Sequence, residues 1–489
     1  MSEKHAQGIL LPVFSLPGTG PIGTIGADAY RFIDFLSKAN IQYWQMLPLN
    51  PVDEYHSPYA SKSVFAGNPA LVDFTLLQEE GFLPEVLNRS KGQAKQSTTI
   101  DYALVDQQTE ELFRLSYDYS KDSLLAELKD FIWEHPEIYD YCLYRALKKH
   151  FEQTSWVDWP ESFKRKRPEA IQAFEKSHQE EIRYHVYQQY VFMRQLQQLK
   201  KYAHSKNVLL VGDIPLYIPF DGADAWSNPG LIQTNEDLGP DLVSGAPPDA
   251  FNAAGQKWDM PVYDWEHHHE TDYAWWIHRI RYAFHSFDLV RIDHFRGLQA
   301  YWAIPYQDQD AQNGFWRKGP GENFLSKIKE TFPKRQFIVE DLGHITEDVH
   351  VLKKFFDHPG MKVLQFAFDD NPFNPHLPQQ VTQNDVYYSG THDNPSLQMW
   401  YAALSDLQRD RIQSSFACFD QKSCIENLLK AVLQSDAQIA IVQFQDLLPE
   451  EDCGRINAPG TIQDNWCYRV SNTVNYEAII PIWFRLIHE

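Results

Sequence analysis

Cysteine is scarce in this sequence. The 489 residues contain five cysteines, widely spread and without C-x-x-C spacing: Cys142, Cys418, Cys424, Cys453 and Cys467. A cysteine zinc site or a disulfide framework needs closely spaced or paired cysteines, so neither is indicated. We therefore expect buried free thiols in a reducing compartment, which favours the cytoplasm.

Long apolar runs are also missing. No run approaches the roughly 20 residues that a membrane-spanning helix needs. The first residues, MSEKHAQGILLPVFSLPGTG, lack the basic segment and long apolar core of a signal peptide. We therefore expect a cytoplasmic protein without a membrane partner.

Basic residues are fewer than acidic ones. Lysine and arginine number 44 against 66 aspartates and glutamates, which gives a net charge of −22. A surface this acidic repels phosphate backbones and anionic lipids, so a nucleic-acid partner is not expected. No obligatory protein partner is evident either.

Recognisable metal-binding motifs are absent as well. The sequence has no H-E-x-x-H and no EF-hand loop. Acidic and histidine residues do lie close together at 293–294, 340–344 and 392–393. Such groups can ligate metals, so a metal site remains an alternative. We expect no metal and no cofactor, and activity restored to a chelated sample by a divalent metal would contradict this.

A glycine pattern near the start mimics a dinucleotide-binding loop. Gly18, Gly20 and Gly23 match G-x-G-x-x-G between an apolar run and a helical pattern. That fold also needs an acid at the end of its second strand, whereas the first acid after the second run here is Asp53. Pro21 removes an amide N–H from the loop that would hold the pyrophosphate. A dehydrogenase is therefore not expected.

Eight short apolar runs have the pattern of buried strands, and helical patterns separate most of them. They span 8–16, 43–50, 207–218, 287–293, 336–342, 362–368, 386–390 and 438–444. This alternation predicts the α/β class and a (β/α)8 TIM barrel, with 1–489 as a single barrel domain. The second connection is too long for one loop, so we interpret 51–206 as an inserted, mainly helical subdomain between strands 2 and 3. We interpret 219–272 as an inserted lid or loop subdomain between strands 3 and 4.

Three acidic residues stand at or just after the ends of predicted strands: Asp293, Glu340 and Asp393. An acid at such a place can also be a helix N-cap. Three together predict a catalytic site, because the carboxyl ends of barrel strands converge on one face. Carboxylates with arginine and histidine nearby suit a neutral, oxygen-rich substrate, and sugars are the leading candidate.

The residues around these acids fit chemistry at an anomeric carbon. Arg291 lies two residues before Asp293, so both side chains point to the same face of the strand, and a cation there would keep a nucleophile ionised. Glu340 follows an apolar run, which predicts a carboxyl with a raised pKa. His392 and Asp393 could hydrogen-bond ring hydroxyls. Aromatic residues make up 14% of the chain, and several lie in loops, where flat rings suit sugar rings.

Eight motifs together give the sequence a family resemblance. In order they are SLPGTGPIGTIG, SPYASKSVFAGNP, GDIPLYI, GAPPDAFNAAGQKW, RIDHFRG, VEDLG, GTHDN and RINAPGTIQDNWCYR. The chain resembles the 4-α-glucanotransferases (amylomaltase, or disproportionating enzyme) of the α-amylase clan over nearly its whole length. The resemblance implies a barrel without a C-terminal β-domain. It also implies transfer of α-1,4-glucan segments between maltooligosaccharides by a retaining double displacement, with amylose or glycogen-derived glucans as further partners.

By the same resemblance, Asp293 is the nucleophile, Glu340 the general acid/base and Asp393 the stabiliser of the transition state. The residues expected to line the subsite of the transferred glucose are Tyr59, Asp213, Arg291, His294 and His392. Those expected on or near the acceptor side are Asp249, Gln256, Trp258 and Asn465, with Phe251 in a lid over 245–258.

Two other functions remain open from the residues alone. The three carboxylates by themselves do not distinguish a transferase from a hydrolase, and the resemblance together with the lid favours a transferase. A non-enzymatic glucan-binding protein would need aromatic residues and a groove. It would not need three acids at strand ends with an arginine directed at one of them.

Overall fold

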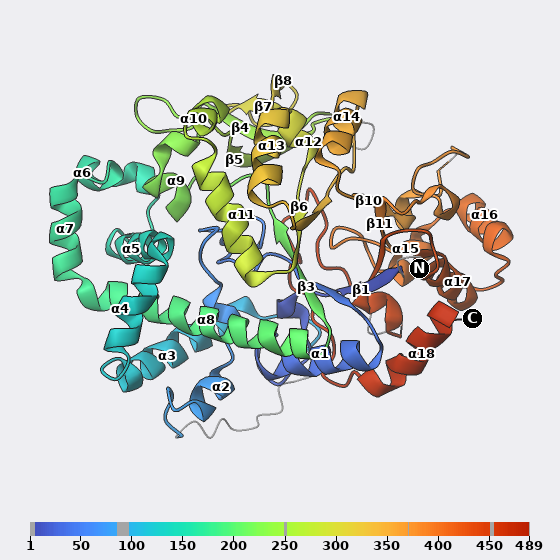
Figure 1. Ribbon diagram of the computed structural model, residues 1–489, viewed down its shortest axis with the longest axis horizontal. Helices are drawn as coiled ribbons and strands as arrows, with labels where there is room; N and C mark the ends of the chain where they lie inside the picture. Colours follow the sequence, from blue (N-terminus) through green and yellow to red (C-terminus); the bar gives the residue numbers. More distant parts are fainter. Residues whose placement is uncertain (1–4, 86–96, 249–251, 370, 450–453, 489) are drawn as a thin grey trace.

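Eight parallel strands close into a barrel at the centre of the molecule (Figure 1). The computed structural model describes residues 5–85, 97–248, 252–369, 371–449 and 454–488. Around the barrel the order is β1-β12-β11-β10-β9-β6-β3-β2. The strands are β1 (Ala6–Leu10), β2 (Tyr43–Gln45), β3 (Leu209–Ile214), β6 (Leu289–Ile292), β9 (Gln336–Val339), β10 (Gly360–Val363), β11 (Asp385–Tyr388) and β12 (Ile439–Gln443). Each overlaps one of the eight apolar runs, so the predicted barrel is confirmed.

The barrel strands are apolar because both of their faces are covered. Every residue of β6, β11 and β12 is buried, as expected where one face meets the barrel interior and the other meets helices. The surrounding helices include α1 (Ala27–Lys38), α8 (Gln179–Ser205), α11 (Ala274–Ser286), α13 (Gly321–Thr331), α14 (Glu347–Phe356), α17 (Gln421–Leu433) and α18 (Tyr476–His488). Helix α8 packs against both α1 and β3 and then leads directly into β3.

Helices also dominate the described chain between β2 and β3 (Figure 1). Before α8 they are α2 (Phe74–Glu79), α3 (Tyr102–Ser120), α4 (Leu125–Glu134), α5 (Pro136–His150), α6 (Glu161–Lys164) and α7 (Pro168–Ser177). Helices α3, α4 and α5 all pack on α8. The long helix therefore joins this region to the barrel wall, and the division of the chain at 51–206 stays a prediction.

A second, four-stranded antiparallel sheet lies beside the barrel, in the order β5-β4-β7-β8. Its strands are β4 (Leu242–Ala246), β5 (Gln256–Pro261), β7 (Ala300–Pro305) and β8 (Phe315–Lys318). Two come from 219–272, which also holds α9 (Ala223–Ser227) and α10 (Trp265–Glu270), and two follow α12 (Arg296–Gln299). The region expected to be a lid or loop thus contributes half of a sheet. Its strands are hard to recognise in the sequence because β5, QKWDMP, lacks an apolar run.

One disulfide contradicts the expectation of free thiols. Cys418 and Cys424 are bonded, with a Cα–Cα distance of 5.0 Å. Cys418 lies in the turn between α16 (Asp406–Phe416) and α17, where the left-handed backbone of Ala417 reverses the chain, and Cys424 lies in the first turn of α17. Their separation of six residues matches no recognisable motif, and only the turn brings the two together. Cys142 and Cys467 are free, and Cys453 lies outside the described residues.

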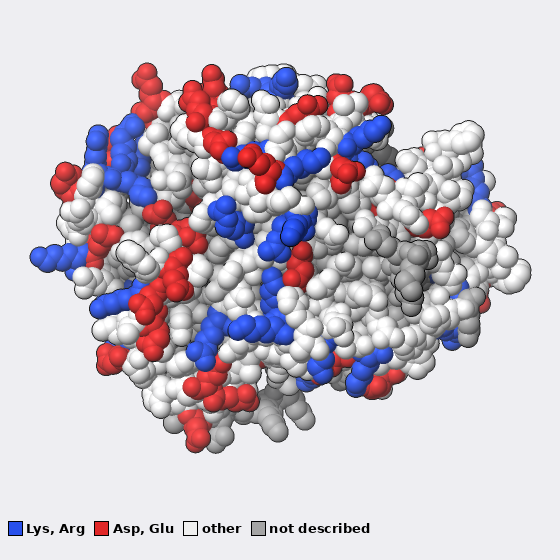
Figure 2. Space-filling model, viewed as in Figure 1, with Lys and Arg blue, Asp and Glu red and all other residues white. Residues whose placement is uncertain are grey.

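Acidic and basic side chains are intermingled over the face shown in Figure 2.

Within the described ranges, no helix combines the length and apolar character that crossing a membrane requires.

Candidate active site

The three predicted carboxylates lie at the same end of the barrel. Asp293 directly follows β6, Glu340 directly follows β9, and Asp393 lies five residues beyond β11. Strands β6 and β9 are neighbours, and the Glu340 N–H donates to the carbonyl of Ile292 at 3.0 Å. The parallel strands therefore place these side chains at the carboxyl-terminal face, where barrel enzymes carry their active sites.

Arg291 joins two carboxylates from inside the barrel. Its Nη1 lies 2.8 and 2.7 Å from the two carboxylate oxygens of Asp213, and its Nη2 lies 2.8 Å from Asp293 Oδ1. The Arg291 side chain is 6% exposed and that of Asp213 is fully buried. Burial works to lower the pKa of Arg291, but the Asp213 and Asp293 carboxylates raise it well above its ordinary value. Arg291 is thus a fixed cation beside Asp293.

Asp213 supports this arginine without facing solvent. The Tyr59 hydroxyl donates to its Oδ2 at 2.8 Å. Burial raises the pKa of Asp213 to about 7, and the Asp293 carboxylate adds to the rise, while Arg291 opposes it. The carboxyl therefore sits in a pocket that favours the neutral form and depends on Arg291 and Tyr59 for its charge.

Glu340 is held by two backbone donors. The His294 N–H donates to Oε2 at 2.8 Å, and the Leu342 N–H donates to Oε1 at 3.0 Å. Burial raises the pKa of Glu340 to about 8, opposed by Arg291 and assisted by the Asp293 carboxylate. His294 has a left-handed backbone, with φ of 48°, a conformation that is costly for a residue with a side chain. This turn directs the His294 N–H at Glu340. The residue that follows the proposed nucleophile therefore orients the proposed acid/base.

Asp393 is more open than Asp293, with side chains 42% and 28% exposed. Its Oδ1 accepts a hydrogen bond from Asn457 Nδ2 at 2.6 Å and lies 3.3 Å from His392 Nε2. Arg455 Nη2 donates to the Asp393 carbonyl at 2.7 Å. Burial lowers the pKa of His392, which favours its neutral form. Asp393 is thus fixed at one oxygen and leaves the other toward solvent.

An aromatic wall stands beside this carboxylate. The Tyr59 and His392 rings are stacked at 4.8 Å between centroids, and Trp466 lies 5.8 Å from Tyr59 and 5.9 Å from His392. Trp466 has a left-handed backbone, with φ of 62°, and its carbonyl accepts a hydrogen bond from the Tyr102 hydroxyl at 2.8 Å. This hydrogen bond thus holds the strained turn in the position where the Trp466 indole completes the aromatic wall.

Sequence reasoning missed three residues of this site: Arg455, Asn457 and Trp466. All lie in the motif RINAPGTIQDNWCYR, of which only Asn465 was predicted to be a site residue. The available signal was the clustering of polar and aromatic residues in a loop without secondary structure. In the structure the Asn465 amide stays within its own loop, where it accepts from the Ala458 N–H and donates to the Thr461 carbonyl, both at 2.8 Å.

The expected acceptor side is described in part. The Trp258 ring lies edge-on to His294 at 4.8 Å between centroids, and its Nε1 donates to Gln256 Oε1 at 3.1 Å. Burial lowers the pKa of His294 to about 4, so this ring is neutral at physiological pH. Asp249 and Phe251 lie outside the described residues, and their placement stays a prediction.

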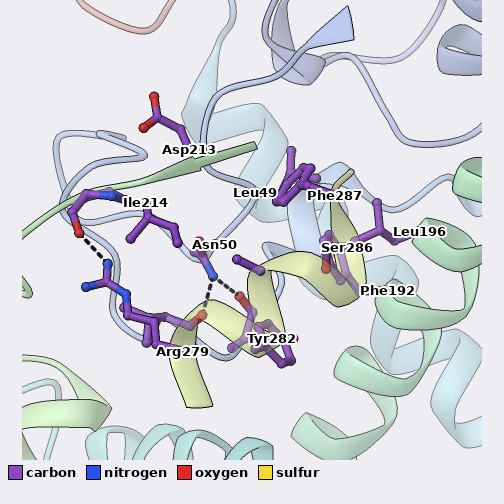
Figure 3. A pocket seen from close by; sticks show the side chains of 14 residues that line it. Leu49, Asn50, Phe192, Leu196, Asp213, Ile214, Arg279, Tyr282, Ser286 and Phe287 are labelled. Carbon is purple, nitrogen blue, oxygen red and sulfur yellow. Dashed lines mark hydrogen bonds between the residues drawn. The ribbon is translucent and has the colours of Figure 1, made fainter. Parts of the chain in front are cut away.

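A small cavity of about 40 Å³ lies behind β3, against α8 and α11 (Figure 3). Arg279 crosses beside it and donates to the carbonyls of Pro215 at 2.5 Å and Leu216 at 3.2 Å. The Asp213 carboxylate points away from this cavity (Figure 3). The space suits water rather than a sugar ring, and its lining anchors the chain just beyond Asp213.

The described residues contain no group of three or more histidine, cysteine or acidic side chains placed to hold a metal ion. The acid–histidine pairs at 293–294 and 392–393 are instead engaged with Arg291, Trp258, Tyr59 and Asn457.

Known proteins match this chain over almost its whole length. The family model described as "Glyco_hydro_77: 4-alpha-glucanotransferase" matches residues 11–474. A 4-alpha-glucanotransferase of Aquifex aeolicus (strain VF5) is 40% identical over 95% of this chain and 95% of its own, and one of Clostridium butyricum is 38% identical over 94% and 96%. The solved amylomaltase from Streptococcus agalactiae in complex with acarbose superposes with a TM-score of 0.94 at 33% identity, covering 99% of each chain. The chain therefore belongs to the 4-α-glucanotransferase family.

Proposed function

We propose that this chain moves α-1,4-glucan segments between maltooligosaccharides by a retaining double displacement through a covalent glycosyl-enzyme intermediate. The observation that carries the proposal is the pairing of Asp293, held by Arg291 at 2.8 Å, with Glu340, whose pKa is raised to about 8. One carboxylate fixed by a cation and one carboxyl that keeps its proton at neutral pH are what a nucleophile and an acid/base require.

In the first half of the reaction, an Asp293 carboxylate oxygen bonds to the anomeric carbon as the glycosidic C–O bond breaks. Glu340 transfers its proton to the departing oxygen, so the remaining glucan leaves as an alcohol. Glu340 is then a carboxylate, and the two N–H donors of His294 and Leu342 stabilise that charge. The Arg291 cation stays beside Asp293, whose negative charge is lost when the new ester bond forms.

In the second half, the 4-hydroxyl of an acceptor glucan gives its proton to Glu340. The acceptor oxygen bonds to the anomeric carbon from the face that the leaving group vacated, and the bond to Asp293 breaks. Two inversions restore the α configuration, and both carboxyls return to their starting protonation states.

We assign Asp393 to the stabilisation of the sugar in the transition state. Asn457 and His392 hold one of its oxygens, and the side chain remains 42% exposed to the site. A carboxylate held ready in this way can accept hydrogen bonds from ring hydroxyls and favours the positive charge that develops on the ring. Tyr59, stacked on His392, provides a flat face for the same glucose unit.

Residues on the acceptor side favour transfer over hydrolysis. Trp258, packed against His294 next to the nucleophile, offers a flat ring to an incoming sugar. A bound sugar hydroxyl has an advantage of proximity over water, which gains no such binding energy. Gln256 and the predicted Asp249, Phe251 and Asn465 would contribute to this side.

Maltotriose as the only substrate tests the proposal. We expect glucose together with a ladder of longer oligosaccharides, with the total number of reducing ends almost constant, because each transfer breaks one glycosidic bond and makes another. A steady rise in reducing ends without products longer than maltotriose would identify a hydrolase instead.

The substrates we propose are maltooligosaccharides and, as longer donors, amylose or glycogen-derived glucans, without a cofactor. We also propose a cytoplasmic location. Cell fractionation tests it.

A further inference from the structure

Arg296 is a buried cation without an acidic partner. Arg296 is 7% exposed, and no ion pair joins it to a carboxylate of the described residues. Its Nη1 makes one long hydrogen bond, to Thr346 Oγ1 at 3.5 Å, and its buried Nε has no partner. A buried guanidinium normally finds a carboxylate or several carbonyls. Arg296 is therefore held in place by packing rather than by an acidic partner.

Trp316 covers this guanidinium and is itself exposed. The Arg296 guanidinium carbon lies 4.0 Å from the centroid of the Trp316 ring, a cation–π contact that fixes both planes. Trp302 supports the Trp316 ring from the side, with centroids 5.1 Å apart and planes inclined by 71°. Trp316 is 41% exposed on β8, the edge strand of the second sheet. An indole braced on two sides and open elsewhere is a rigid platform.

The pair lies next to the proposed acceptor side. Arg296 is the first residue of α12, directly after the turn that holds Asp293 and His294, and His294 contacts Trp258. Its partner Thr346 belongs to the loop that follows Glu340. The aromatic wall of Tyr59, His392 and Trp466 belongs to other elements, the loops after β2, β11 and β12. Arg296 and Trp316 are thus grouped with the residues that meet the acceptor.

We propose that Trp316 and Arg296 form a distal acceptor subsite, which binds a glucose unit of the acceptor chain beyond the unit that contacts Trp258. The proposal rests on the proposed function and deepens it. The C–H face of a glucose ring stacks on the open face of the indole, and Arg296 behind the ring and Trp302 beside it hold the indole in place. A neutral sugar suits this place better than an anion, because Asp293 and Glu340 are close by and the chain carries a net charge of −22.

The dependence of transfer on acceptor length tests the subsite. The donor is α-maltotriosyl fluoride with its terminal 4-hydroxyl blocked, so that it cannot act as an acceptor, and the acceptors are glucose, maltose, maltotriose and maltotetraose. The measured quantity is kcat/KM for maltotetraose divided by kcat/KM for glucose. We expect Trp316→Ala to lower this ratio about tenfold, equivalent to about 1.4 kcal/mol of transition-state binding.

Three further variants separate binding from structure. Trp316→Leu keeps apolar volume over Arg296 but removes the flat face, so it should lower the ratio as Trp316→Ala does. Trp316→Phe keeps a ring and should restore most of it. Phe315→Ala is the matched control, because Phe315 is the preceding residue on the same edge strand and is 46% exposed. It should leave the ratio at the wild-type value.

The outcomes are distinct. A ratio within twofold of wild type in both Trp316→Ala and Trp316→Leu would overturn the subsite, and so would an equal loss in Phe315→Ala. Wild-type enzyme that releases fluoride only by hydrolysis, with no acceptor elongated, would overturn the proposed function itself. Loss of the length dependence in the two Trp316 variants alone, with transfer to glucose retained, supports the subsite.

Discussion

Replacement of Glu340 by alanine is the most informative perturbation of this site. It removes the group proposed to give and take the proton, and general acid/base groups typically contribute about 10²–10⁴-fold, or roughly 3–5 kcal/mol, to a rate. The His294 and Leu342 N–H groups lose their acceptor. Unsatisfied donors cost about 1–3 kcal/mol each when buried, and water can replace the carboxylate in this half-buried place. We therefore expect a large loss of turnover and a small loss of stability.

The choice of donor and nucleophile makes the assay specific. With α-maltotriosyl fluoride the leaving group needs little protonation, so the first step should survive in Glu340→Ala. Azide attacks without giving up a proton, so it should restore turnover and yield α-maltotriosyl azide. With maltotriose as donor, azide should restore nothing, because the sugar leaving group still lacks its acid.

The pH profile supplies an independent readout of the same group. An acid must be protonated to act, and burial raises the pKa of Glu340 to about 8. Wild-type kcat/KM should therefore be retained below that pH and fall as the pH rises through about 8. Glu340→Ala with the fluoride donor should lack this basic limb. Formation of β-maltotriosyl azide, or a basic limb that persists in the variant, would refute the assignment, since the first result makes Glu340 the nucleophile.

Three other predictions concern separate parts of the molecule. Asp293→Asn should reduce turnover more than about a hundredfold with the fold retained by circular dichroism, and more than a tenth of the wild-type rate would contradict its role as nucleophile. Trp258→Ala should raise the ratio of hydrolysis to transfer, measured as reducing ends per elongated product, and an unchanged ratio would remove Trp258 from the acceptor side. Cys418→Ser should lower the free energy of unfolding by roughly 2 kcal/mol, the loop-closure value for a bridge across six residues. An unfolding midpoint that does not respond to reductant in the wild type would show that the bridge is not formed in solution.

The barrel could be predicted because its strands are buried on both faces. Runs such as QFIVEDL and QIAIVQF are continuous apolar segments with an acid or amide at the end. Because both faces of these strands are buried, apolar residues do not alternate with polar ones, and the runs are easy to recognise. The acids at the ends of two of these strands then fall on one face as a matter of topology. For this reason the sequence alone is enough to place Asp293 and Glu340 together.

The second sheet and part of the site could not be predicted in this way. β5 carries Gln256, Lys257 and Asp259, so no periodicity stands out from its Gly- and Pro-rich surroundings. Asn457 and Trp466 reach the site from a loop, where position depends on a left-handed turn and on partners far away in the sequence. The disulfide likewise depends on a turn between two helices that no motif records.

The closure of the barrel also determines when the protein can finish folding. β1 lies between β2 and β12, and its Ala6 pairs with Ile439. A ribosome adds about 5–20 residues per second, so β1 waits roughly 20–90 s for that partner. During this time one edge of the growing sheet presents unpaired N–H and C=O groups, which are a template for association with other chains. Fragments that end before β12 should therefore aggregate, and synthesis of this chain should depend on factors that shield an open sheet edge.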